Sequence, residues 1–346
     1  MKGRQILLGR ISGHDAAALF VDGRLEELAI DPGDLVPFAP GAILRGRVGR
    51  LMKGLGGVFV TLPGGVTGYL RDRSGLGEGQ NVLVQVSGVA EPGKALPLNG
   101  RLLIRGRNGI ATPTVPGVNI SRSIRDSEER QALQALGEAA LEGRECGLIL
   151  RSAARLAVDE EIAAELSELV DLAMAITVDA EGAPELLLDA ASPADTAWRD
   201  WADPEPDAVE EYDDLPDDAL DAIHALIDPQ IALPAGASAM IEPTRALIAI
   251  DVNTGPDSSP AAGLKANIAL ARDLPRQLRL RGLGGQVVID FAPMSKRERG
   301  TLEQELKKAF RSEGADAVLS GWTPMGLFEM TRKRERMPLD RLLENG

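Results

Sequence analysis

Two apolar runs in the C-terminal third of the sequence each end in an aspartate, and this repetition constrains the fold more than any other feature. Residues 245–250 precede Asp251, and residues 285–289 precede Asp290. The stretch 264–281 between them has a helical pattern. A strand, a helix and a second strand in succession form a crossover unit whose strands are parallel. Both strands then end at one edge of a sheet, so we expect the two aspartates to lie together.

Two carboxylates at one sheet edge repel each other unless a proton or a cation lies between them. Mg²⁺ binds proteins through one or two carboxylates together with substrate phosphate, so the pair is a candidate metal site. Asn253 follows Asp251 by two residues and would point to the same side of an extended strand. The alternative is that each aspartate only closes its strand, as a turn former or a helix cap.

The helix expected between these strands is rich in arginine and contains one proline. Pro275 lacks a backbone donor, so we expect a kink or a break there. Arginine and lysine on this helix and just beyond it would surround the carboxylates with positive charge: Arg272, Arg276, Arg279, Arg281, Lys296, Arg297 and Arg299. A second helix is expected over about 296–310, followed by a short strand at 317–319.

Other chemistries have less support. The two histidines, His14 and His224, are isolated, and the sequence contains no Gly-x-x-x-x-Gly-Lys-[Ser/Thr] loop for nucleotide hydrolysis. Cys146 is the only cysteine, which excludes an internal disulfide and a multi-cysteine zinc site. No run of about 18 apolar residues is present. A charged residue also follows the N-terminal apolar run too soon for a signal peptide. We therefore expect a cytoplasmic protein with no membrane segment.

Short strands divided by glycine turns are expected over 41–107. A Pro63-Gly64-Gly65 turn predicts a hairpin. Five strands in so short a stretch are typical of a small OB-type barrel, although a barrel without a ligand gives the same pattern. The expected strands are 43–48, 57–62, 66–70, 81–86 and 102–104.

The remaining segments predict strands, one long helix and one acidic stretch. Three N-terminal strand-like runs should pair with a later part of the chain: 5–8, 16–20 and 24–30. Residues 159–176 carry apolar side chains at helical spacing, and residues 183–188 begin a strand. The stretch 195–221 is crowded with Asp, Glu and Pro, which predicts a solvated linker or a poorly ordered loop. The alternative is that its acids mimic phosphate and cover a basic groove.

The net charge of −14 conceals an uneven distribution. Residues 1–155 carry 20 Lys and Arg against 15 Asp and Glu, and residues 231–346 carry 17 against 14. Residues 156–230 carry 1 against 23. Because local field matters more than net charge to a polyanion, the two basic flanks leave nucleic-acid binding open.

Three blocks of the sequence, with their spacing, resemble the catalytic signature of the ribonuclease E/G family: residues 249–255, 276–285 and 288–291. Further similarity lies at 327–334, 117–122 and 147–152, and it is weak from about 153 to 235. The resemblance implies an endoribonuclease that hydrolyses single-stranded RNA in RNA processing or decay. In such an enzyme Asp251 and Asp290 would hold Mg²⁺, with Mn²⁺ as a substitute, and Asn253 would position the scissile phosphate. The products would carry a 5′-phosphate and a 3′-hydroxyl.

The resemblance also implies RNA contacts outside the carboxylates. Phe59 and Tyr69 match aromatic positions that stack on bases, and Lys94 matches a basic position that faces RNA. We expect Arg279 and Arg281 to contact RNA as well. The alternative for Phe59, between Val58 and Val60, is a place in the barrel core.

Two further residues resemble a pair that senses a 5′-monophosphate end. Arg151 supplies a guanidinium fork, and Ser152 supplies a hydroxyl in place of the usual threonine. We expect Arg122 beside them. The alternative is an arginine that is simply a surface charge at the end of a strand.

The resemblance implies an α+β multidomain fold. It comprises an OB-fold barrel inserted in a reduced ribonuclease-H-like subdomain, followed by a DNase-I-like α/β catalytic domain. The expected boundaries are 1–36 and 181–240 for the ribonuclease-H-like subdomain, 37–107 for the barrel, 108–180 for the sensor-like region and 241–346 for the catalytic domain.

The sequence also departs from the family after its catalytic blocks. No cysteine follows Cys146, so the family's zinc link and small dimerisation domain are not expected, nor is structural zinc. We expect a monomer or a dimer without a zinc link. The alternative function is an RNA-binding module with weak or no cleavage activity.

Overall fold

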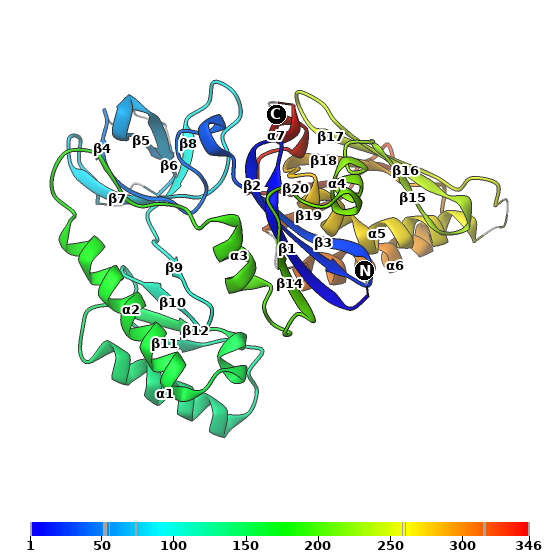
Figure 1. Ribbon diagram of the computed structural model, residues 1–346. Coiled ribbons are helices and arrows are strands. Elements are labelled where there is room, and N and C mark those ends of the chain that lie inside the picture. The colour runs from blue at the N-terminus through cyan, green and yellow to red at the C-terminus, as the bar shows by residue number, and fades with distance from the viewer. Residues whose placement is uncertain are drawn as a thin grey trace. The chain divides into compact units, whose positions relative to one another are not determined.

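The computed structural model describes residues 2–50, 54, 56–72, 75–257, 259, 261–313 and 316–344 (Figure 1). The chain forms two compact units. One unit combines Met1–Pro32 with Asp207–Gly346, and the other is Gly33–Pro206. Within the described ranges, each helix is either too short or too polar to cross a lipid bilayer.

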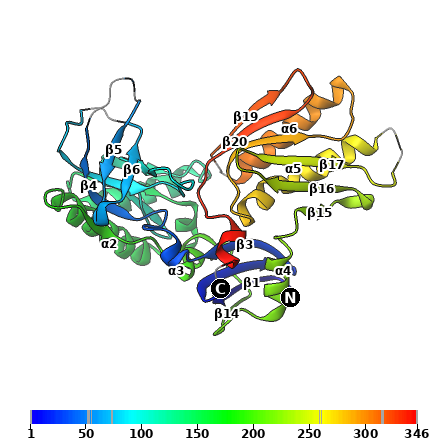
Figure 2. The same cartoon turned by 90° about the horizontal axis from the view of Figure 1, so that it is seen from above.

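A six-stranded sheet organises the C-terminal part of the first unit, and Figure 2 shows its strands side by side. Its order is β15-β16-β17-β18-β20-β19, and the central strands β17 and β18 are parallel, as the crossover pattern predicts. The neighbouring pairs are antiparallel. The strands are β15 (Gln230–Ala232), β16 (Ser238–Pro243), β17 (Ile248–Asn253), β18 (Gly285–Asp290), β19 (Ala317–Trp322) and β20 (Phe328–Arg332).

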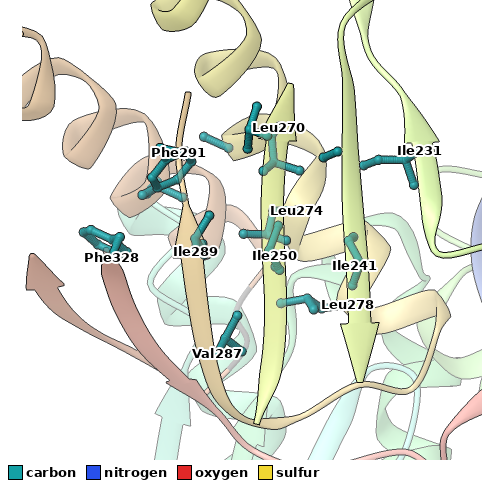
Figure 3. Close-up of a cluster of buried hydrophobic side chains, with 14 of the residues drawn as sticks. Ile231, Ile241, Ile250, Leu270, Leu274, Leu278, Val287, Ile289, Phe291 and Phe328 are labelled. Atoms are coloured by element: carbon teal, nitrogen blue, oxygen red, sulfur yellow. The ribbon is translucent and has the colours of Figure 1, made fainter. Parts of the chain in front are cut away.

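Helices α5 (Ala262–Leu280) and α6 (Lys296–Glu313) cover one face of this sheet. Leu270, Leu274 and Leu278 repeat every four residues on α5 and pack against strand side chains such as Ile250 and Ile289 (Figure 3). This apolar stripe is the reason the segment folds as a helix against the sheet. Helix α5 runs through Pro275 without ending, so the expected break does not occur.

The three N-terminal strands and β14 form a second, four-stranded sheet of the same unit, with order β14-β1-β2-β3. Strand β1 pairs in parallel with β14, which confirms that the N-terminal strands pair with a later segment. Apolar side chains of α4 and α7 pack into the same core. The elements are β1 (Arg4–Ile11), β2 (His14–Val21), β3 (Arg24–Ile30), β14 (Ala208–Glu211), α4 (Asp217–His224) and α7 (Leu339–Leu343). The 3₁₀ turn η4 (Pro234–Gly236) joins β15 to β16 in the six-stranded sheet.

The second unit begins with a five-stranded barrel, consistent with the expected OB fold. Strands β4 and β7 pair directly and close the order β4-β5-β6-β8-β7, and β13 adds to β4. The fifth strand is β8, not the expected 102–104, because Ile104 belongs to β9 in another sheet. The elements are η1 (Gly33–Leu35), β4 (Ile43–Val48), β5 (Val58–Thr61), η2 (Pro63–Gly65), β6 (Thr67–Leu70), β7 (Asn81–Val86), β8 (Leu96–Asn99) and β13 (Glu185–Leu188).

The same unit contains a small sheet with order β11-β12-β10-β9, and two helices share its core. All five apolar positions expected on the long helix are buried: Ile162, Leu166, Leu169, Ala173 and Ile176. The elements are β9 (Ile104–Arg105), β10 (Gly109–Thr112), β11 (Gly117–Ile120), α1 (Ser127–Leu141), β12 (Gly147–Leu150), η3 (Ser152–Leu156) and α2 (Asp159–Val178).

The acidic stretch 195–221 is structured, which overturns the expectation of a solvated linker or loop. It contributes to α3 (Pro193–Asp200), to β14 and to α4. A capping box in which Ser192 and Asp195 bond reciprocally begins α3. Buried Trp201 follows the helix directly. Apolar residues at helical spacing, rather than net charge, therefore decide the structure of this stretch.

Candidate active site

The structure brings Asp251 and Asp290 together at one edge of the six-stranded sheet. They are direct partners in the parallel register of β17 and β18, with Ile250 beside Ile289 one step earlier. Neighbouring strands lie about 4.8 Å apart, so the two carboxylates extend from adjacent backbone positions. The predicted juxtaposition is therefore present.

Strand alternation sets the direction of these side chains. On β17, Ile250 and Val252 are buried, whereas Asp251 and Asn253 are exposed. Because Ile250 packs in the core beneath α5 and α6, the exposed side chains lie on the sheet face that these helices do not cover. The Asn253 amide donates a hydrogen bond of 2.7 Å to Asp251 Oδ2 and fixes that carboxylate.

The side chains of Asp251, Asn253 and Asp290 offer oxygen ligands at this edge. Within the described ranges, no three His, Cys, Asp or Glu side chains lie close enough to hold one metal ion. The aspartate pair can thus offer two carboxylates at most. That donor set fits Mg²⁺, which keeps several waters and binds through one or two carboxylates and substrate phosphate.

A residue that the sequence analysis missed holds the end of β18 in place. Asn267 on α5 is fully buried, its Nδ2 donates to Ala292 O at 2.9 Å, and its Oδ1 accepts from Ala292 N at 2.9 Å. Ala292 lies two residues after Asp290, so the contact fixes the turn that presents this carboxylate. The sequence signal for this role is that Asn267 is a polar residue among the apolar positions of α5.

Arg279 and Arg281, the two arginines expected to contact RNA, lie at the C-terminal end of α5 and bind other parts of the protein. Arg281 is buried and donates to the carbonyl oxygens of Leu226 and Asp228. Arg279 pairs with Glu27 at 3.0 Å and with Glu313 at 2.9 Å. The sequence could not reveal these internal partners, which give both arginines a structural role.

The barrel presents an aromatic pair on its outer surface. Phe59 on β5 and Tyr69 on β6 are directly opposite in the antiparallel register, with ring centroids 5.5 Å apart. Their strand neighbours Val58, Val60 and Leu70 point into the barrel core. Phe59 is therefore not a core residue, which excludes that alternative. Both rings are only partly buried, as stacking on a base requires.

Lys94 lies in the loop between β7 and β8. Its side chain is exposed and pairs with Glu91 three residues earlier. An exposed pair of this kind contributes little to stability, so the ammonium group remains available to a phosphate.

The candidate phosphate-sensing residues gather at one edge of the small sheet in the same unit. Strands β11 and β12 are parallel, with Ile120 beside Leu150. Arg122 therefore follows β11 on the edge where Arg151 and Ser152 follow β12. Arg122 and Ser152 are exposed.

The Arg151 guanidinium already has an acidic partner. Its Nη2 donates to Asp200 Oδ1 at 2.7 Å, and its Nη1 donates to Gly106 O at 2.7 Å. Burial raises the pKa of the Asp200 carboxyl group, but hydrogen bonds and charge from Arg199 and Arg151 outweigh this effect and leave the pKa below its ordinary value. Asp200 is therefore ionised at neutral pH.

These features define a class of α+β protein in which a small β-barrel accompanies an α/β sheet with paired carboxylates at its edge. A sequence model described as "Ribonuclease E/G family" matches residues 103–214 and 218–335. The match covers more than half of the chain, and the chain belongs to the ribonuclease E/G family.

Individual relatives agree with this assignment. The chain is 28% identical to a ribonuclease E of Nostoc sp. over 93% of its own length and 55% of the relative's. It is 24% identical to a ribonuclease G of Escherichia coli over 98% of its length and 82% of the relative's. A chloroplastic ribonuclease E/G-like protein of Arabidopsis thaliana is 37% identical over 33% of this chain and 12% of the relative. The chain thus spans about half the length of the cyanobacterial relative.

Proposed function

We propose that the chain is an endoribonuclease that hydrolyses single-stranded RNA in RNA processing or decay, with its active site at Asp251, Asn253 and Asp290. The observation that carries this proposal is the register of β17 and β18, which makes the two aspartates direct neighbours on an uncovered sheet face. Membership of the ribonuclease E/G family supports the same activity.

Asp251 and Asp290 would hold Mg²⁺, and Mn²⁺ could take its place because it also accepts oxygen ligands. When bound, the metal ion would supply a Lewis acid for the phosphoryl oxygens and lower the pKa of a water molecule. Asn253 keeps Asp251 oriented and has an amide that can bind a phosphate oxygen. In-line attack by water would leave a 5′-phosphate on one product and a 3′-hydroxyl on the other.

RNA binding is assigned to the second unit. Phe59 and Tyr69 would stack on bases without strong sequence preference, and Lys94 would contact the backbone. Arg151, Ser152 and Arg122 would bind a terminal 5′-phosphate, because guanidinium forks and hydroxyl groups suit phosphate oxygens. The barrel's closed pairing of β4 with β7 supports an OB-type module.

We further propose the domain roles that the family resemblance implies. Residues 1–36 and 181–240, which include the four-stranded sheet, would form a reduced ribonuclease-H-like subdomain interrupted by the barrel (37–107) and the sensor-like region (108–180). Residues 241–346 would form a DNase-I-like catalytic domain. Pairing of β1 with β14 supports the interrupted arrangement, since the first strands find their partner after the inserted region.

Cleavage of a fluorescent, A/U-rich single-stranded RNA with a 5′-monophosphate tests the proposal. We expect cleavage with Mg²⁺, none with EDTA, and a rate at least about 100-fold lower for Asp290→Asn. Glu242→Gln is the matched control, because Glu242 is an exposed carboxylate on β16 of the same sheet. Full activity of Asp290→Asn would refute the site. Binding without cleavage by the wild type would favour the alternative, an RNA-binding module.

A further inference from the structure

Two guanidinium groups converge on one carboxylate at the candidate phosphate site. Arg151 Nη2 donates to Asp200 Oδ1 at 2.7 Å, and Arg199 Nη2 and Nε donate to Asp200 Oδ2 at 2.7 and 3.1 Å. Guanidinium groups bind phosphate through two parallel hydrogen bonds, and arginine is over-represented where proteins recognise phosphate. Here the two guanidinium groups bind an acidic side chain of the protein itself.

Helix α3 brings Asp200 to this position. Its capping box fixes the start of the helix, and buried Trp201 anchors the residue after Asp200. Arg107 reinforces the packing, with its guanidinium 5.6 Å from the centre of the Trp198 ring. Asp200 is the last residue of α3, where the helix dipole disfavours a negative charge. The arginines offset that unfavourable placement.

Arg151 does not depend on Asp200 for its orientation. Its Nη1 donates to Gly106 O at 2.7 Å and to Arg199 O at 3.4 Å, so backbone groups already hold the guanidinium. Asp200 instead takes up the Nη2 donor that an incoming anion would use. A residue with this arrangement competes with a ligand rather than preparing the site for it.

We propose that Asp200 is the resident anion of the Arg151–Arg199 site and that a terminal 5′-phosphate of RNA binds by displacing it. A monophosphate carries close to two negative charges and three acceptor oxygens, so it replaces a single carboxylate, whereas a 5′-hydroxyl end cannot. Asp200 thereby sets how strongly the protein distinguishes phosphorylated from unphosphorylated ends. The inference rests on the proposed phosphate-binding role of Arg151, and it makes Arg199 a second arginine of that site.

Binding of two matched oligoribonucleotides, one with a 5′-monophosphate and one with a 5′-hydroxyl, tests the inference by fluorescence anisotropy. The measurements use the full chain carrying Asp290→Asn, which prevents cleavage. The preference is the Kd for the hydroxyl end divided by the Kd for the phosphate end. We expect Asp200→Asn to raise this preference about fivefold, as removal of a partly exposed competing ion pair predicts. Arg151→Gln should abolish it.

Glu205→Gln is the matched control, since it removes one exposed acidic charge from the same segment. It should leave the preference unchanged. A rise equal to that of Asp200→Asn would show that the effect comes from net charge alone, and it would overturn the inference. A preference that falls in Asp200→Asn would make Asp200 a positioning residue, and an unchanged preference would remove it from the site. Either result overturns the inference.

Hydrogen exchange on the chain with native Asp200 provides a second test that does not require Asp200→Asn to fold. Because the phosphate would displace Asp200, the α3 amides should exchange faster when the phosphorylated oligoribonucleotide is bound than when the hydroxyl one is bound. Equal or slower exchange would contradict the displacement. The two proposals fail separately. Cleavage with a phosphate preference that Asp200→Asn leaves unchanged sinks only the Asp200 inference. Mg²⁺-dependent cleavage without any phosphate preference sinks the phosphate-binding role of Arg151 as well, and phosphate preference without cleavage sinks only the nuclease.

Discussion

Asn267 and Ala292 exchange two buried hydrogen bonds, and through them helix α5 holds the turn that follows Asp290. Asn267→Ala removes both bonds and leaves the Ala292 backbone groups buried without partners. We expect a loss of about 2–3 kcal/mol in the free energy of unfolding, measured by urea denaturation. RNA cleavage should fall as well, because the carboxylate is less firmly placed. Asn119→Ala, at an exposed position, should change the stability little.

Phe59 and Val60 are adjacent on β5 but face opposite sides of the barrel wall. Phe59→Ala should weaken single-stranded RNA binding by about 1–3 kcal/mol, the value of one stacked base, with a small effect on stability. Val60→Ala should do the reverse, because its side chain is fully buried in the barrel core. Anisotropy with a fluorescent RNA and urea denaturation separate the two effects. Equal RNA affinity of wild type and Phe59→Ala would exclude stacking at this position.

Arg281 provides a test of its structural role. Arg281→Met should lower the free energy of unfolding by about 3 kcal/mol, since the carbonyl oxygens of Leu226 and Asp228 lose their buried donor. RNA affinity of the folded fraction should stay unchanged. The exposed Arg245 serves as the comparison, and Arg245→Met should leave the stability within about 0.5 kcal/mol of the wild type. Weakened RNA binding at unchanged stability would instead indicate that Arg281 contacts RNA.

The Asp200 ion pairs predict a pH dependence of stability. Because the folded-state pKa lies below the ordinary value of 3.8, the contribution is fully present above about pH 4. It is lost as the pH falls through the lowered pKa. The free energy of unfolding of the wild type should therefore exceed that of Asp200→Asn at pH 7, and the difference should shrink below pH 3.8. A difference that grows as the pH falls would contradict the assigned charge state.

Local patterns predicted the parts of the fold that depend on neighbours in sequence. Strand alternation and the crossover rule were sufficient to place Asp251 beside Asp290, and helical spacing identified the buried positions of α2. Contacts between distant segments were not predictable in the same way. The barrel's fifth strand was assigned to 102–104 because that run is apolar, whereas the pairing with β6 and β7 selects Leu96–Asn99.

Composition predicts the wrong structure for the acidic segment for a related reason. Its composition indicates solvation, but a few buried residues such as Ala197, Trp201 and Ile223 are enough to order it. The partner of each charge was also invisible in the sequence. Only the structure pairs Asp200 with Arg151, and only the structure buries Arg281 against carbonyl oxygens. The alternative that acids of this segment mimic phosphate now has a specific candidate in Asp200.

The parallel pairing of β1 with β14 has a consequence for the order of events on the ribosome. Gln5 lies beside Ala208, so the four-stranded sheet lacks its edge strand β14 until residues 208–211 have been synthesised. Residues 33–206 form a continuous unit that can complete its own core before then. This unit should therefore fold before the four-stranded sheet is complete, while β1 waits with an unpaired strand edge, the kind of surface that chaperones protect.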